Sequence, residues 1–143
     1  MSSKYPGAVP YLVYRDAVAA IDFLVSVFGF ELGNRLDMQD GSVAHCELRI
    51  GSAAIMISSE FASMGLASPI DQQTRYSQVM VMVENVDDHH RKAQAAGANI
   101  TAPPQEQPFG DKLYRVSDPE GHRWIFSQHI REVPASEWMK MMS

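Results

Sequence analysis

A weak internal repeat constrains the fold of this chain more than any other feature. A short apolar run at residues 9–14 is followed by Asp16, which is a candidate helix N-cap. Apolar residues then recur with helical spacing as far as Phe28, and this pattern predicts one amphipathic helix. Gly29 follows at the position where a glycine commonly ends a helix.

The same order of strand, helix and glycine occurs a second time. An apolar strand is predicted at residues 79–83, and Asp87 is a candidate cap for a helix over residues 88–96. Gly97 ends that helix, 68 residues after Gly29 (97 − 29). The chain is therefore predicted to contain two similar half-units.

Each of the two glycines is followed by sequence typical of antiparallel hairpins, with turns rich in glycine and proline. The predicted strand pairs are residues 43–50 with 53–57, joined by Gly51-Ser52, and residues 113–117 with 122–128, joined by Asp118-Pro119-Glu120-Gly121. Two such halves give an α+β fold in which a curved mixed sheet carries helices on one face and leaves a cleft on the other. A single ferredoxin-like sheet with halves that are similar by chance is the alternative.

Composition limits what such a chain can bind. A length of 143 residues fits one domain, and 12 basic against 17 acidic residues give a net charge of −5. This balance argues against a nucleic-acid partner, because binding to phosphates depends on clustered Lys and Arg. No apolar run could span a membrane and no signal-peptide pattern is present, so we expect a cytoplasmic protein without a membrane partner. Cys46 is expected to be a buried thiol, with an intermolecular disulfide as the alternative.

The segment between the two halves, residues 59–75, shows neither the helical nor the strand spacing of apolar residues. It is a crossing linker, a lid over the cleft, or a stretch that contains a helical turn. Residues 134–142 predict a short C-terminal helix, with Trp138 packing inside the chain or against a second subunit. The chain is therefore one domain, residues 1–143, made of module 5–58, linker 59–75 and module 76–131.

Several segments resemble the glyoxalase, bleomycin-resistance and extradiol-dioxygenase superfamily, also called vicinal oxygen chelate, and more narrowly its PhnB-like and bleomycin-resistance-like members. The segments are VPYLVYRDAVAAIDFLVSVFGFEL, AHCELRIGSAAIMIS, VMVMVENVDDHHRKAQAAGANI and FGDKLYRVSDPEGHRWIFSQH. The resemblance covers most of residues 9–129. It implies two βαβββ modules around a cleft in a homodimer, with the modules pairing within one chain or between two.

The resemblance also implies where a metal ion would bind. The superfamily's metal-dependent enzymes take one ligand, usually His or Glu, from the first and last strands of each module. The matching positions here are Val9, Met56, Gln78 and Ile125. Valine and isoleucine have no lone pair, and one thioether with one amide is too weak a donor set for Zn²⁺, Ni²⁺ or Mn²⁺. We therefore expect no metal cofactor, which disfavours glyoxalase and dioxygenase activity.

The histidines suggest one alternative. His45 and Glu47 face the same side of a predicted strand and His122 lies beside a turn, so the three could form a relocated metal site. That site would make the protein a glyoxalase-type lyase or isomerase. Histidines that bond to their strand neighbours are the simpler interpretation. In the second helix, His90 is expected on the apolar side and His89 toward solvent.

Strand alternation predicts a ligand-binding surface opposite the helices, whereas Trp124 and Phe126 should pack beneath them. That surface is rich in methionine, which suits irregular or aromatic ligands, although the nine methionines could also simply fill a core. We predict a metal-free protein of the antibiotic-resistance type, without assigned catalytic residues, that sequesters a small, partly aromatic ligand. The acidic composition favours a cationic one. The predicted ligand-binding residues are Tyr11, Met56, Ser58, Gln78, Met80, Phe109, Arg123 and Ile125.

Overall fold

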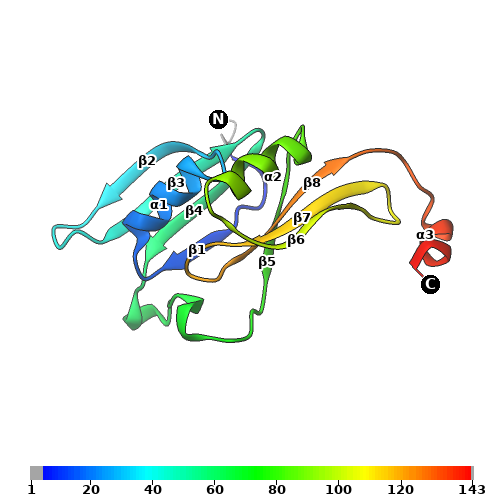
Figure 1. Cartoon of the computed structure of the whole chain (residues 1–143). Helices are drawn as coiled ribbons and strands as arrows, with labels where there is room; N and C mark the ends of the chain where they lie inside the picture. Colours follow the sequence, from blue (N-terminus) through cyan, green and yellow to red (C-terminus); the bar gives the residue numbers. More distant parts are fainter. Residues whose placement is uncertain (1–4, 143) are drawn as a thin grey trace. The chain divides into compact units, whose positions relative to one another are not determined.

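The structure is a computed structural model that describes residues 5–142, with side chains up to residue 140 (Figure 1). The chain divides into two compact units. Unit 1 comprises residues 5–76 together with the turn Asp118–His122, and unit 2 comprises Ser77–Ser117 and residues 123–142. Both units run strand, helix and three strands, which confirms the α+β class with two βαβββ modules.

Unit 1 contains a four-stranded mixed sheet with an α-helix against it. Its elements are β1 (Tyr11–Tyr14), α1 (Ala17–Ser26), β2 (Glu31–Asp37), β3 (Val43–Ile50) and β4 (Ala53–Ser59). The strand order is β1-β4-β3-β2, with β1 parallel to β4 and the other pairs antiparallel. The predicted hairpin through Gly51-Ser52 is confirmed by the junction of β3 with β4.

Helix α1 lies against one face of this sheet (Figure 1). The Asp16 carboxylate caps the helix by accepting the Ala19 N–H at 3.0 Å, and Gly29 follows the helix with φ 83°, as predicted. The side chains between helix and sheet are buried: Ile21, Leu24, Cys46, Leu48, Ile55 and Ile57. The opposite side of the sheet, here called the open face of unit 1, carries Tyr11, Val13, His45, Glu47, Arg49, Ala54, Met56 and Ser58.

Unit 2 repeats this topology. Its elements are β5 (Gln78–Met82), α2 (Val86–Ala95), β6 (Asn99–Glu106), β7 (Asp111–Ser117) and β8 (Arg123–His129), followed by α3 (Ala135–Met142). The strand order is β5-β8-β7-β6, and β5 is parallel to β8. Trp124 and Phe126 are fully buried on the side of α2, as strand alternation predicted. Gln78, Met80, Arg115, Arg123 and Ile125 share the other side, here called the open face of unit 2.

The predicted start of the second helix is wrong. Helix α2 begins at Val86, and the Asn85 side chain caps it by accepting the Asp88 N–H at 3.0 Å. Asn85 has the extended backbone of an N-cap residue, and Val86 is fully buried, which fixes the first turn. The Asp87 carboxylate accepts a hydrogen bond from Lys112 Nζ at 2.9 Å instead.

The predicted exposure of His89 is also wrong. Val86 is the first helical residue, and His89 and His90 follow it by three and four residues. Both histidines therefore share the helix face of Val86. His89 Nδ1 lies 2.7 Å from the Tyr114 hydroxyl, and its ring centroid lies 4.0 Å from that of Phe126. His90 packs edge-on against the Tyr114 ring.

The segment between the modules contains two short 3-10 turns, η1 (Ala62–Met64) and η2 (Pro69–Asp71), so the alternative that included a helical turn is confirmed. The predicted C-terminal helix is present as α3, where the Trp138 indole N–H donates to the Val133 carbonyl at 2.9 Å. Among the described helices, α1 to α3, none is long and apolar enough to cross a membrane.

Candidate functional site

The open face of unit 1 brings three of the predicted ligand-binding residues together. Tyr11 on β1 lies opposite Met56 on β4, and Met56 lies opposite Glu47 on β3. Tyr11 is 51% exposed, Met56 is half-buried, and Ser58 lies two residues along β4 and is buried. An aromatic ring, a thioether and a carboxylate therefore form one row across three strands.

A β-bulge in the edge strand β2 holds the carboxylate of this row. The pairing of β2 with β3 jumps from Leu32 to Arg35, so Gly33 and Asn34 lie outside the ladder. The freed Asn34 N–H donates to Glu47 Oε1 at 2.9 Å. Gly33 lies so close that a Cβ atom there would come within 2.5 Å of Glu47 Cγ. The bulge therefore fixes both the position and the orientation of Glu47.

An aromatic ring from the N-terminal segment completes the surroundings of Glu47. The Tyr5 hydroxyl donates to Glu47 Oε2, and the Arg49 guanidinium lies 4.4 Å from the centroid of the Tyr5 ring. The hydrogen bonds from the Asn34 N–H and from the Tyr5 hydroxyl lower the pKa of Glu47. Glu47 is therefore a carboxylate at neutral pH, although the residue is only 7% exposed.

His45 lies on the same strand and has its own aromatic neighbour. Its Nδ1 atom is 2.9 Å from the Tyr11 hydroxyl, and partial burial raises the pKa of Tyr11. The Tyr11 hydroxyl is therefore neutral at physiological pH. This pair matches the simpler interpretation of His45, a strand-face histidine bonded to a neighbour.

The open face of unit 2 carries four further predicted residues. Gln78 lies opposite Arg123, and Met80 lies opposite Ile125. Met80 is 50% exposed and Ile125 is buried. Arg115 on β7 lies opposite Ile125 on β8, and its guanidinium donates to Gln78 Oε1 at 3.4 Å. The sequence pattern did not point to Arg115 as a residue of this face, because β7 is not among the strands that carry the ligand positions.

Phe109 does not lie on these strands. It lies between β6 and β7, and its ring packs edge-on against Trp138 of α3 with centroids 5.9 Å apart. Within unit 2, Phe109 is therefore a packing partner of the C-terminal helix.

The positions that the resemblance assigns to metal ligands do not suit a divalent ion. Val9 offers no donor, Ile125 is a buried hydrocarbon, and Gln78 already accepts a hydrogen bond from Arg115. Among the described residues, no three His, Cys, Asp or Glu side chains are grouped so that they could hold a metal ion. No chemical step through a metal at these positions is supported.

His45, Glu47 and His122 do not form the relocated metal site that was the alternative. His122 Nε2–H donates to the backbone carbonyl of Val13 at 2.9 Å, so this nitrogen already has a partner. Glu47 is bonded to Asn34 and Tyr5, as described above. Each of the three side chains has a separate structural partner.

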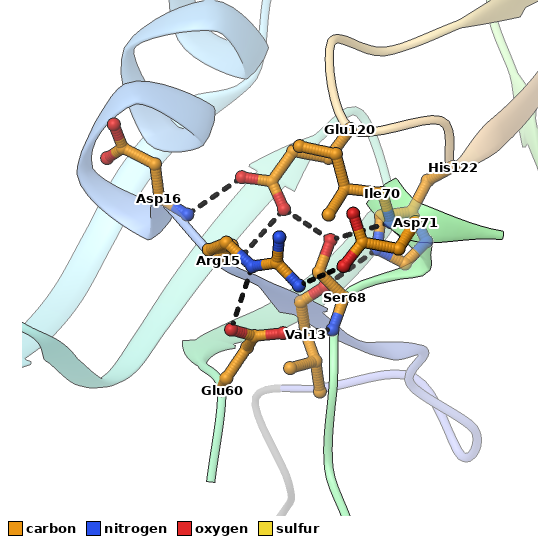
Figure 2. Close-up of polar contacts among 9 residues, drawn as sticks. All are labelled: Val13, Arg15, Asp16, Glu60, Ser68, Ile70, Asp71, Glu120 and His122. Carbon is orange, nitrogen blue, oxygen red and sulfur yellow. Dashed lines mark hydrogen bonds and ion pairs between the residues drawn. The ribbon is translucent and has the colours of Figure 1, made fainter. Parts of the chain in front are cut away.

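A second polar cluster lies at the end of β1 (Figure 2). The buried Glu120 carboxylate accepts the backbone N–H groups of Arg15 at 2.6 Å and Asp16 at 2.8 Å, and the Ser68 hydroxyl at 2.5 Å. We call this cluster the Glu120 clasp. It joins the turn Asp118–His122 to the start of α1 and to the linker, so it serves the structure of unit 1.

Arg15 extends the clasp toward the linker. Its guanidinium pairs with Glu60 at 3.2 Å and with Asp71 at 2.7 Å (Figure 2). These are exposed ion pairs, which contribute little stability individually. The sequence does not reveal the clasp, because an acidic residue in a turn with proline and glycine carries no signature of a distant partner.

Two pockets of unit 1 lie near the clasp. One has a volume of about 40 Å³, enough for water but not for a drug-sized ligand. The other, of about 460 Å³, is open and lies at the start of α1 between Arg15, Ser42 and Glu60. Its lining has no aromatic or methionine side chain, so it does not suit a partly aromatic ligand.

Comparisons with known proteins agree with the architecture. The chain is 33% identical to TioX from Micromonospora sp. ML1, whose crystal structure it matches with a TM-score of 0.70 over 90% of this chain and all of that one. It is 34% identical over 142 residues to the uncharacterized protein Mb0911c of Mycobacterium bovis, covering 96% of this chain and 93% of that protein. A superfamily protein from Nocardioides, 18% identical, shares the fold with a TM-score of 0.63 over 94% of this chain and 90% of that one.

The family model agrees with these similarities. The model of the Glyoxalase/Bleomycin resistance protein/Dioxygenase superfamily matches residues 8–126, which include every strand of both modules except the last three residues of β8. Fold and sequence together therefore place this chain in the Glyoxalase/Bleomycin resistance protein/Dioxygenase superfamily.

Proposed function

We propose that this protein is a metal-free binding protein that sequesters a small, partly aromatic, cationic molecule on its open sheet faces. The observation that carries the proposal is the half-exposed Tyr11 lying opposite Met56 on the sheet face opposite α1. Rings and thioethers that remain exposed on such a face are typical of sites for apolar or aromatic ligands. Sequestration of this kind would give resistance to an antibiotic, as in bleomycin-resistance-like members.

Two features support a positive charge on the ligand. The chain has a net charge of −5, and Glu47 places a carboxylate in the same row as Tyr11 and Met56. An aromatic ring beside a fixed carboxylate favours a cation through charge and cation–π attraction. On the open face of unit 2, the proposal assigns ligand contacts to Gln78, Met80 and Arg123.

The proposal is tested by a thermal-shift screen of cationic glycopeptides and aromatic drugs. A ligand that binds only the folded protein raises the melting temperature in a saturable way. We expect Met56→Arg to abolish that rise, because it puts a long cation into the middle of the row. Met139→Arg is the matched control, since Met139 is 74% exposed on α3. A hit that Met56→Arg leaves unchanged would refute the assignment to this face.

Metal content and assembly are tested on the same purified protein. We expect elemental analysis to find no stoichiometric metal, because the ligand positions hold Val9, Met56, Gln78 and Ile125. One tightly bound equivalent that is lost in His45→Ala would overturn the metal-free proposal. We also propose a homodimer, and a monomer mass by light scattering would contradict it.

A further inference from the structure

The open face of unit 1 already holds an aromatic ring, which is the phenol of Tyr5. The Glu47 carboxylate accepts a hydrogen bond from the Tyr5 hydroxyl, and the Arg49 guanidinium lies 4.4 Å from the centroid of the Tyr5 ring. Glu47 and Arg49 are two residues apart on β3, so both project from the same side of the sheet. We call Glu47 and Arg49, together with the two residues that hold Glu47 in place, Gly33 and Asn34, the phenol niche.

The niche recognises two properties of its occupant. Glu47 Oε2 can accept an O–H, and a carboxylate that is already ionised cannot donate one in return. The Arg49 guanidinium attracts the π-face of an aromatic ring. An unsubstituted ring therefore satisfies only Arg49, and a phenolate is repelled by the charge of Glu47. A neutral hydroxyaromatic group satisfies both.

The acceptor is held independently of the ring. The Asn34 N–H and the close approach of Gly33 orient Glu47 through the backbone of β2, and neither contact involves Tyr5. A preorganised acceptor can therefore receive a different hydroxyl without rebuilding the site.

Tyr5 lies in a segment without regular secondary structure. It is half-buried, and residues 6–10 between it and β1 form neither helix nor strand. Its hydroxyl remains protonated, because the hydrogen bond to Glu47 raises the pKa of Tyr5. Met56 of the proposed ligand face lies directly opposite Glu47, so a molecule on that face has the niche within reach.

We propose that the phenol niche is a subsite for a hydroxyaromatic group of the ligand, and that Tyr5 is its exchangeable internal occupant. The inference rests on the proposed ligand face and adds the chemistry that one part of the ligand must have. Binding replaces the Tyr5 hydroxyl at Glu47 by the hydroxyl of the ligand, so the hydrogen bond from Tyr5 to Glu47 breaks and one from the ligand to Glu47 forms.

The experiment uses the full chain with Tyr5→Ala, which empties the niche, and 4-methylphenol as the probe. Binding is followed by the NMR shift of the Asn34 amide, because that N–H donates to Glu47. We expect a saturable shift in Tyr5→Ala, and a probe affinity for the wild-type chain weaker by roughly tenfold or more, because the tethered Tyr5 competes at high effective concentration. Toluene, which has the same ring without the hydroxyl, should give no saturable Asn34 shift.

A second variant distinguishes recognition of the hydroxyl by Glu47 from simple filling of the space that Tyr5 leaves. Adding Glu47→Gln to Tyr5→Ala removes the charge of the acceptor, and we expect the preference for 4-methylphenol over toluene to fall. Equal affinities of Tyr5→Ala and wild type would overturn the role of Tyr5 as occupant. Equal shifts of the Asn34 amide with 4-methylphenol and with toluene in Tyr5→Ala would overturn the niche itself.

The two proposals fail in different ways. A drug whose stabilisation is lost in Met56→Arg but unchanged in Tyr5→Ala and in Glu47→Gln would leave the ligand face standing and overturn the phenol niche. Selective binding of 4-methylphenol to Tyr5→Ala supports the niche even where no drug in the screen binds.

Discussion

The Glu120 carboxylate accepts the backbone N–H of Asp16 at 2.8 Å, and Asp16 is itself the N-cap of α1. The turn Asp118–His122 therefore contacts α1 at its N-cap. The same carboxylate also receives the Arg15 N–H and the Ser68 hydroxyl, so three donors converge on two oxygens. Such a convergence needs a carboxylate, because both of its oxygens are acceptors.

Glu120→Gln is predicted to destabilise the protein. An amide keeps one acceptor oxygen and turns an NH₂ group toward a donor, which leaves a buried N–H or hydroxyl without a partner. We expect the free energy of unfolding to fall by about 1–3 kcal/mol, measured by urea denaturation. Glu84→Gln at an exposed position is the matched control. Equal free energies of unfolding for the two variants would show that the Glu120 clasp does not stabilise the protein.

Tyr14→Phe is predicted to destabilise the same unit through the neighbouring carboxylate. The buried Tyr14 hydroxyl donates to Asp118 Oδ2 at 2.6 Å, and burial together with the charge of Asp118 raises the pKa of Tyr14, so the hydroxyl stays a donor. A hydrogen bond to a charged group contributes about 1.5–3 kcal/mol, and we expect a loss of that size in chemical denaturation. Tyr76→Phe, at a residue that is 87% exposed, should change stability by less than about 0.5 kcal/mol.

The stability of unit 2 is predicted to depend on the protonation of His129. Its Nδ1 lies 2.7 Å from Asp111 and its Nε2 2.9 Å from Glu132, and the hydrogen bond to Asp111 is the main reason that the pKa of His129 is raised. A raised pKa means that this contribution is full below the unfolded value of about 6.5 and is lost as pH rises through the folded value.

His129→Gln tests this dependence. We expect the melting temperature of the wild type to exceed that of His129→Gln at pH 5.5, and the difference to shrink at pH 8.5. At pH 8.5 the imidazole is neutral, so its hydrogen bonds to Asp111 and Glu132 are no longer strengthened by a positive charge. A difference that grows with pH would contradict the assignment.

Asn85→Ala is predicted to weaken α2. The Asn85 side chain is the N-cap, and replacing such a residue by alanine costs about 1 kcal/mol, measured by thermal or urea unfolding. Asn85→Asp keeps an acceptor at the same place and should leave stability nearly unchanged. If Asn85→Ala were neutral, the helix would be capped elsewhere, as the sequence pattern with Asp87 had suggested.

The order of the elements was predictable because it depends on local pattern. The residues after Asp16, with their helical spacing and the glycine at position 29, predicted α1, and the turn Gly51-Ser52 predicted the β3–β4 hairpin. The start of α2 was not predictable in the same way, since Asn85 and Asp87 are both good caps and the burial of Val86 decided between them.

The sequence by itself determined the order of strand, helix, glycine and hairpin in each half, because periodicity and residue type are local properties, and the resemblance assigned the metal-ligand positions. Only the tertiary structure decided what Glu47 and Glu120 contact. The β2 bulge turns the Asn34 N–H toward Glu47, which is 13 residues away, and Glu120 meets the Arg15 N–H across 105 residues. Alternation assigns a side chain to a face of a sheet, but the distant donor that it meets there is fixed only when the strands pair and the turns pack.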